Sequence, residues 1–265
     1  MRGVQAIDSG GVNHGFVRAT DGTITVFDAP GAGSGNNEGT IAYAINAAGT
    51  ISGTYFDSGR VLHGFVRATG GAITTYDAPG AGTSKGAGTN GYGINSAGTV
   101  AGYYYDSGGV IHGFVRTSKG VITAFDAPGA GSGFLQGTIA GSINTAGTAV
   151  GAYIDSGSVL HGFARAANGT FTDFDIPGAG SGVNQGTSPY GVNAAGFIAG
   201  FYTDSADVSH GFGRAPNGQT ITFTIPGSGS AVDQGTFANS INTGEQVTGY
   251  YIDSGSVYHG FIAAR

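Results

Sequence analysis

The sequence predicts an all-β protein, a five-bladed β-propeller built from 49-residue repeats of four strands each. The prediction rests on a fixed internal period, on glycine-rich turns between short runs of β-branched and aromatic residues, and on the lack of a helical apolar stripe. Each histidine begins the tripeptide His-Gly-Phe and lies 49 residues from the next. These histidines are His14, His63, His112, His161, His210 and His259.

Each repeat is expected to contain four strands, which the second repeat illustrates. They cover approximately residues 41–46, 51–57, 62–68 and 72–77. The turns between them, "NAAG", "DSGRV" and "TGG", are tight and contain glycines for backbone conformations with positive φ. The next link, "APGAGTSKGAG", is long enough to cross from the outer edge of one sheet to the inner edge of the next. This is the wiring of a propeller blade.

The chain contains five first strands, which predicts five blades. Residues 1–30 hold a second, third and fourth strand, and residues 237–265 hold a first, second and third. Combining the two ends would complete one blade and close the ring without exposed edges. The N-terminal second strand, "VQAID", lacks the Gly-x-Tyr of the other copies, so the copy around Tyr251 is expected in the ring. Six blades, of which the first and last are incomplete, is the alternative.

The whole chain is expected to form one domain. A single propeller would cover residues 1–265, with repeats that begin at His14, His63, His112, His161 and His210 and a closing segment at 259–265.

The composition excludes several classes of protein. Charged residues make up 10% of the chain, the net charge is −6, and the ten Lys and Arg residues form no basic stripe, which disfavours nucleic acid as a partner. No apolar stretch is long enough for a membrane span, and the start "MRGVQAIDSGG" lacks a signal-peptide core. The absence of cysteine excludes disulfides and a thiol nucleophile.

Asp, Ser and His recur together on one predicted face. Propeller wiring places the turn with Asp57 and Ser58, and the nearby His63, on the same face as the long crossover. A catalytic triad is not needed once per repeat, so we interpret these residues as cross-strand hydrogen bonds that fix the hairpin. Two ligands per repeat are also too few for a closed metal site, and no metal or cofactor is predicted. The structural set comprises the six histidines named above with Asp57, Asp106, Asp155, Asp204 and Asp253.

The unit "HGFVRATDGTITVFDAPGAG…YAINAAGTISGTYFDSG" resembles the HAF repeats of bacterial, mostly extracellular proteins. The signature of that family pairs a His-Ala-Phe strand with a "DGT" turn and an "AIN..G.VVG" hairpin. The resemblance covers the whole chain, but Gly64 and its counterparts replace the usual alanine, and the "DAPGAG" loop lies outside the pattern. The resemblance implies a secreted or cell-surface protein and assigns no catalytic residue.

The repeats differ mainly in the middle of the crossovers, where contacts with a ligand are therefore sought. These segments read "SGNNEG", "TSKGAG", "SGFLQG", "SGVNQG" and "SAVDQG". Amides and backbone groups beside tyrosine suit sugars, because hydroxyls bond to the polar groups and the pyranose face packs on a ring. The predicted ligand-binding residues are Asn36, Asn37, Lys85, Gln136, Asn184, Gln185, Asp233, Gln234, Tyr55, Tyr104, Tyr153, Tyr202 and Tyr251.

The sequence thus predicts a multivalent, lectin-like protein with equivalent sites between blades, and glycans or a cell-surface polymer as partners. A structural or adhesive surface module is the first alternative, either monomeric or joined through its end strands. A glycosidase with its site in the central funnel is the second. The sequence favours a non-enzymatic role, because the acids that do not repeat scatter over both predicted faces. They are Glu38, Asp173, Asp207, Asp233 and Glu245.

Overall fold

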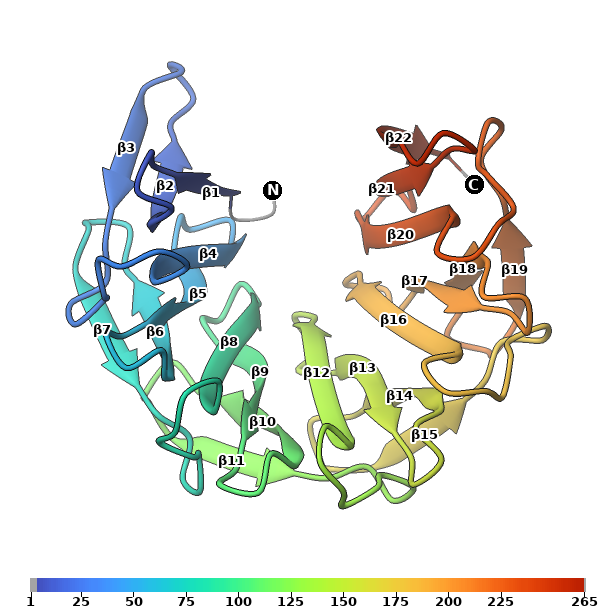
Figure 1. Ribbon diagram of the computed structural model, residues 1–265, viewed down its shortest axis with the longest axis horizontal. Coiled ribbons are helices and arrows are strands. Elements are labelled where there is room, and N and C mark those ends of the chain that lie inside the picture. The colour runs from blue at the N-terminus through green and yellow to red at the C-terminus, as the bar shows by residue number, and fades with distance from the viewer. Residues whose placement is uncertain (1–3, 265) are drawn as a thin grey trace. The chain divides into compact units, whose positions relative to one another are not determined.

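The computed structural model describes residues 4–264, and over this range the protein is all-β, with 22 strands joined by turns and loops (Figure 1). No helix that could cross a membrane occurs in this range. The chain divides into two compact units, Met1–Phe125 and Asp126–Arg265.

Unit 1 contains one three-stranded and two four-stranded antiparallel sheets. Their strands are β1 (Val4–Ile7), β2 (Asn13–Arg18) and β3 (Ile24–Phe27); β4 (Gly39–Ile45), β5 (Ile51–Phe56), β6 (Leu62–Arg67) and β7 (Ile73–Tyr76); and β8 (Gly88–Ile94), β9 (Val100–Tyr105), β10 (Ile111–Arg116) and β11 (Ile122–Phe125).

Unit 2 contains two four-stranded sheets and one three-stranded sheet. Their strands are β12 (Gly137–Ile143), β13 (Ala149–Ile154), β14 (Leu160–Arg165) and β15 (Phe171–Phe174); β16 (Gly186–Val192), β17 (Ile198–Thr203), β18 (Ser209–Arg214) and β19 (Thr220–Phe223); and β20 (Gly235–Ile241), β21 (Val247–Ile252) and β22 (Tyr258–Ala263).

The predicted strands of the second repeat are confirmed to within about two residues at each end by β4 to β7. The connection between sheets also follows the predicted path, because β7 leads through the crossover to β8, the first strand of the next sheet. A single parallel pairing, Leu62 with Gly88, links the third strand of one sheet to the first strand of the next. Gly88 has φ of +114°, and a Cβ there would lie 2.1 Å from the carbonyl oxygen of Leu62. Glycine therefore permits this close approach.

Five blades are not confirmed. The 22 strands of the described residues fall into six sheets, four of four strands and two of three, which fits six blades better. The N-terminal strand β1 forms although it lacks Gly-x-Tyr, because its backbone pairs with β2 from Val4 opposite Phe16 to Ile7 opposite Asn13. Ladder pairing needs only backbone groups, so the missing motif does not prevent the strand. Both end copies of the second strand, β1 and β21, are thus part of sheets of their own.

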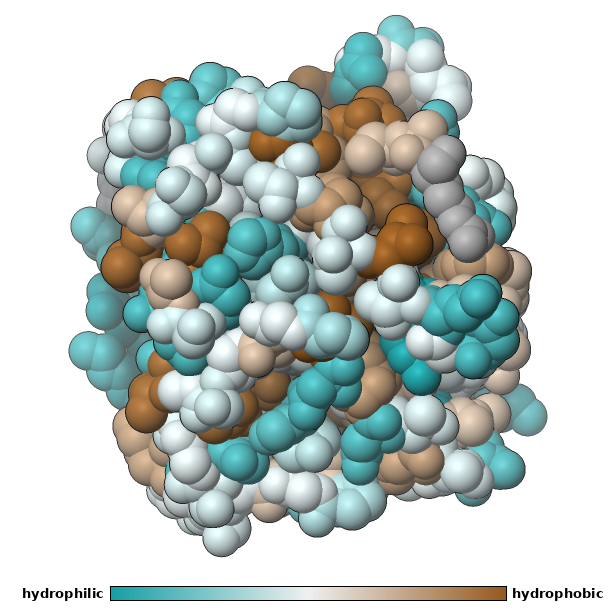
Figure 2. All heavy atoms as spheres, turned by 90° about the vertical axis from the view of Figure 1, so that its right-hand side faces the viewer, coloured by the Kyte–Doolittle hydropathy of each residue, from teal (hydrophilic) through white to brown (hydrophobic). Residues whose placement is uncertain are grey.

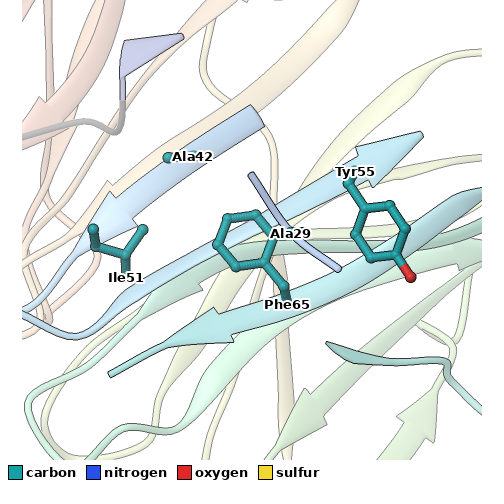
Figure 3. Close-up of a cluster of buried hydrophobic side chains, with 5 residues drawn as sticks. All are labelled: Ala29, Ala42, Ile51, Tyr55 and Phe65. Carbon is teal, nitrogen blue, oxygen red and sulfur yellow. The ribbon is translucent and has the colours of Figure 1, made fainter. Parts of the chain in front are cut away.

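The core of each repeat is centred on the phenylalanine of the His-Gly-Phe tripeptide. In the sheet β4–β7, Phe65 is fully buried and packs with Ile51, Tyr55, Ala42 and the crossover residue Ala29 (Figure 3). The same position is fully buried in other sheets, where it is occupied by Phe114, Phe163 and Phe212. His63 and Phe65 are two residues apart, so both lie on the same face of the third strand. Phe65 packs in the core there, and the partly buried His63 stacks on the ring of Tyr55.

A glycine follows the histidine because an aromatic ring of the fourth strand covers that position. A Cβ on Gly64 would lie 2.5 Å from two ring carbons of Tyr76. Tyr76 cannot easily move, since its ring packs edge-on against Phe114 and under the guanidinium of Arg116. The departure from His-Ala-Phe to His-Gly-Phe therefore has a steric cause in this chain.

The surface has few charges. On the face in Figure 2, apolar residues lie scattered among pale and hydrophilic ones. This agrees with a chain in which only 10% of residues are charged and Gly numbers 54.

Candidate functional site

The aspartate of each second-to-third-strand hairpin organises its own turn. In the sheet β4–β7, Asp57 Oδ1 accepts hydrogen bonds from the backbone N–H groups of Gly59 and Val61, both at 2.8 Å. Its second oxygen lies 3.5 Å from Nε2 of His63. Burial raises the pKa of Asp57, but the two N–H donors and His63 together hold it below its ordinary value. The same turn bonds recur at Asp8, Asp106, Asp155, Asp204 and Asp253.

The histidine connects that turn to the end of the fourth strand. His63 Nδ1 lies 2.9 Å from a carboxylate oxygen of Asp77, which follows β7. His14 bonds in the same way to Asp28, and this bond is the main reason why the pKa of His14 is raised. His161 bonds to Asp175, and His210 bonds to the hydroxyl of Thr224, which replaces the acid.

The repeated tyrosines lie beneath the histidines. Tyr55 is 7% exposed, and its ring stacks on that of His63 with centroids 4.9 Å apart. Tyr104, Tyr153 and Tyr202 are buried in the same stacked arrangement, and Tyr251 is half-buried. These five predicted contact residues therefore support histidines from within the fold, and at least four of them offer almost no ring surface to a ligand.

The crossovers are fixed by bonds that repeat from sheet to sheet. In the first one, the N–H of Ala29 donates to Oγ1 of the fully buried Thr40 at 2.8 Å. The N–H of Asn37 donates to Gly11 in the preceding sheet's hairpin, at 2.9 Å. The crossover 28–39 therefore contacts both the sheet it leaves and the sheet it enters. The buried threonine recurs as Thr89, Thr138, Thr187 and Thr236.

A glutamine or glutamate closes four of the crossover loops from inside. Gln136 accepts a hydrogen bond from the N–H of Gly133 and donates to the carbonyl of Ser156. Gln185 accepts from Gly182 and donates to Asp207. Glu38 and Gln234 make the same loop-closing bond. The predicted contact residues Gln136, Gln185 and Gln234 thus have bonds within the scaffold.

The two residues at the centre of each crossover point outward, and we call these pairs the crossover tips. The tips are residues 36–37, 85–86, 134–135, 183–184 and 232–233. Five predicted ligand-binding residues are exposed there: Asn36, Asn37, Lys85, Asn184 and Asp233.

The sequence reasoning missed the apolar residues of the tips in unit 2. Phe134 is 75% exposed, Val183 65% and Val232 61%, and the three lie 49 residues apart. Leu135, beside Phe134, has φ of +60°, a conformation that costs energy for a branched side chain. The available signal was an apolar residue in the same place of three polar loops, "SGFLQG", "SGVNQG" and "SAVDQG".

The structure is an all-β array of repeated strand units. The hydrogen bonds that hold the crossovers recur from repeat to repeat, whereas the residues of the crossover tips vary. No protein-family model matches the chain, and no curated protein does. Among solved structures, a triple arginine-to-alanine mutant of AofleA from Arthrobotrys oligospora is similar to this chain. The TM-score is 0.51 at 14% identity, over 98% of this chain and 81% of that one. At this identity the similarity shows a shared fold.

Two further structures have lower TM-scores. One is a mutant of the Aleuria aurantia lectin in complex with alpha-methyl-L-fucoside, with a TM-score of 0.38 and 13% identity over 98% of this chain and 94% of that one. The other is described as a fungal lectin with a six-bladed β-propeller fold, with a TM-score of 0.35 and 14% identity over 97% and 89% of the two chains.

Proposed function

We propose that this protein is a multivalent carbohydrate-binding module, lectin-like and without catalytic activity, whose contacts with sugar come from the crossover tips. The observation that supports the proposal is the contrast between scaffold and tip. The bonds of the Thr40 hydroxyl and of the Asn37 backbone recur in other crossovers, whereas the pair of tip side chains is different in each crossover. A residue needed for folding must recur, but a residue that contacts a ligand need not.

The chemistry of the tips suits a sugar. The amides of Asn36, Asn37 and Asn184 and the carboxylate of Asp233 can bond to hydroxyl groups, and Phe134 can pack on the apolar face of a pyranose ring. A single exposed tip buries little of a ligand, so each site is weak alone. Several such sites on one chain bind a glycan-covered surface through avidity.

We also propose that the six sheets are the blades of a propeller. The supporting facts are the 22 strands of the described residues and the repeated path from the fourth strand of one sheet to the first strand of the next. The resemblance to the HAF repeats, and the secreted or cell-surface location that it implies, stay part of the same proposal.

A printed glycan array tests the binding function. The wild-type protein is expected to bind a restricted group of glycans. A variant that combines Asn36→Ala, Phe134→Ala and Asn184→Ala should lose about tenfold or more of that binding, because avidity multiplies the loss at each tip. Lys119→Ala, in an exposed third-to-fourth-strand turn, is the control and should bind normally.

Two results would reject the proposal. Wild-type protein that binds no glycan would leave a structural or adhesive surface module, which the exposed Tyr258 and Ile262 of β22 favour as the second candidate. Release of reducing sugar from a polysaccharide would instead indicate a glycosidase.

A further inference from the structure

The third strand of the last sheet, β22, has an unpaired edge. In each of the other five sheets, the third strand pairs with the second strand on one edge and with the fourth strand on the other. Among the residues that the structure describes, β22 pairs with β21 alone (Figure 1). Its other edge therefore presents backbone N–H and C=O groups that can pair with a further strand.

The aromatic ring that covers the glycine of His-Gly-Phe is absent at β22. In the other sheets the fourth strand places an aromatic residue opposite this glycine. The pairs are Gly15 with Phe27, Gly64 with Tyr76, Gly113 with Phe125, Gly162 with Phe174 and Gly211 with Phe223. A Cβ on Gly260 would meet no atom of the described residues closer than 4.0 Å, whereas one on Gly64 would lie 2.5 Å from the Tyr76 ring. The described residues thus leave the space over Gly260 open.

The histidine of β22 also has one partner fewer than its counterparts. Nδ1 of His63 lies 2.9 Å from the carboxylate of Asp77, and Nδ1 of His14 and of His161 has the same kind of partner. In each case the acid directly follows the aromatic residue of the fourth strand. His259 keeps the bond from Nε2 to its hairpin aspartate, but no described residue binds its Nδ1. Its side chain is 40% exposed, compared with 22% for His63.

One extended strand would fill all three places. The fourth strands read "ITVF", "ITTY", "ITAF", "FTDF" and "TITF", so each ends in an aromatic residue, and aspartate follows in four of the five. In the register of the other sheets, that aromatic residue would lie opposite Gly260 and the aspartate opposite His259. Tyr258 and Ile262 share the face of Gly260 and are 68% and 74% exposed. The ring would therefore lie over the glycine between two apolar side chains, which is a stabilising cross-strand arrangement.

We propose that β22 is a docking site for an extended strand of another protein in which an aromatic residue is followed by aspartate. The strand adds to the sheet β20–β22 as its fourth member. Backbone hydrogen bonds along the edge provide affinity, the space over Gly260 selects the aromatic residue, and the Nδ1 of His259 selects the carboxylate after it. The site uses none of the crossover tips and is independent of the proposed sugar binding.

Fluorescence anisotropy with a labelled peptide tests the proposal. The peptide "DGTITVFDAP", which repeats residues 21–30 of this chain, contains a fourth strand with its aromatic residue and aspartate. Wild-type protein should bind it at one site, and hydrogen exchange of the amides of residues 258–263 should slow in the complex. The same peptide with Phe27→Ala should bind about tenfold more weakly, because it leaves Gly260 uncovered.

Gly260→Ala blocks the site without disturbing the free protein. The added methyl group meets no described atom closer than 4.0 Å, so the melting temperature should stay the same. Peptide binding should fall about tenfold, because the methyl group occupies the place of the ring. Gly141→Ala, in β12 of the same unit, is the matched control. It also adds a methyl group where no described atom lies within 4 Å, and it should change neither quantity.

His259→Gln tests the selection of the acid. On the wild-type protein, the peptide with Asp28→Asn should bind about threefold to tenfold more weakly than the original peptide. On His259→Gln the two peptides should bind equally. His161→Gln is the control, because His161 already binds Asp175, and this variant should keep the preference for the aspartate.

Three results would overturn the proposal. Equal binding of the peptide to the wild type and to a folded Gly260→Ala variant would place the peptide elsewhere. No binding at millimolar peptide would show that the edge accepts no strand. Oligomers of the wild type in sedimentation velocity that Gly260→Ala dissociates would make a second copy of this chain the occupant in place of another protein.

Discussion

The histidine of each repeat is held on two sides and from below. In His63 these contacts are the Asp77 carboxylate at Nδ1, the Asp57 carboxylate beside Nε2, and the Tyr55 ring under the imidazole. The pairing with Asp57 follows from the sequence, because a hairpin places the turn beside the strand that leaves it. The contact with Asp77 does not follow from the sequence, because the position of Asp77 depends on the register between the third and fourth strands, which sets Gly64 opposite Tyr76.

Removing one histidine should lower stability without removing ligand binding. His63→Ala deletes the bond to Asp77 and uncovers Tyr55, so the free energy of unfolding should fall by about 1 to 3 kcal/mol. Urea unfolding followed by circular dichroism measures this change. Ser58→Ala, in the exposed hairpin of the same sheet, is the control. A His63→Ala protein of wild-type stability that no longer bound glycans would make the histidine a contact residue instead.

Stability should depend on pH at both ends of the range. Backbone N–H donors, with that of Val159 first, lower the pKa of Asp155 below its ordinary 3.8, so its contribution is present above that value and is lost as the pH falls through the folded pKa. The bond to Asp28 raises the pKa of His14 above 6.5, so its contribution is present below 6.5 and is lost as the pH rises through the folded pKa.

Urea midpoints measured across the pH range test both effects. The midpoint should fall steeply below about pH 4, where the hairpin carboxylates become protonated. A smaller fall above pH 6.5 should be absent from His14→Gln. A midpoint that stays constant down to about pH 2 would contradict the role given to the aspartates.

At the scale of the strand, the sequence predicts most of the structure, because each strand is bounded by a turn whose glycines and aspartates are recognisable. The prediction that the strand "VQAID" would give way to the copy around Tyr251 is not supported, since β1 pairs in its own sheet. That prediction was based on a side-chain motif, whereas the pairing of β1 with β2 depends on backbone hydrogen bonds. The contact of Gly64 with Tyr76 could not be predicted from the sequence either, because the two residues are 12 positions apart and come together only through the pairing of β6 with β7.

Two glycines near this hairpin should respond differently to the same change. Gly64→Ala places a methyl group against the half-buried Tyr76 ring, which packs on Phe114 and Arg116, and should cost about 1 to 3 kcal/mol of unfolding free energy. Gly70→Ala meets nothing within 4 Å, so it should be neutral or slightly stabilising. Thermal unfolding of the two variants side by side provides the measurement. Equal melting temperatures would show that the Tyr76 ring moves away from the added methyl group at no measurable cost in stability.

At the scale of the whole molecule, the repeated residues predict the scaffold but do not indicate where ligands bind. The hydrogen bond between Thr40 and the N–H of Ala29, for example, recurs at the same two positions in each of the five crossovers. The exposed Phe134 and a cavity of about 570 Å³ in unit 2, beside Ala263, occur at positions where the repeats differ. Residues that all repeats share do not indicate such positions. The predicted number of five blades is not confirmed, because counting first strands omits the sheet that begins with β1, and the 22 strands of the described residues fit six blades better.

The central claim is that sugars contact the crossover tips. It is tested most directly by titrating isotope-labelled protein with the methyl glycoside of a glycan that binds on the array, while the backbone amide resonances are recorded. Shifts are expected at several of the crossover tips, with similar weak affinity at each; the tips are residues 36–37, 85–86, 134–135, 183–184 and 232–233. Shifts confined to the cavity around Phe223 and Ala263, or none at saturating sugar, would contradict it.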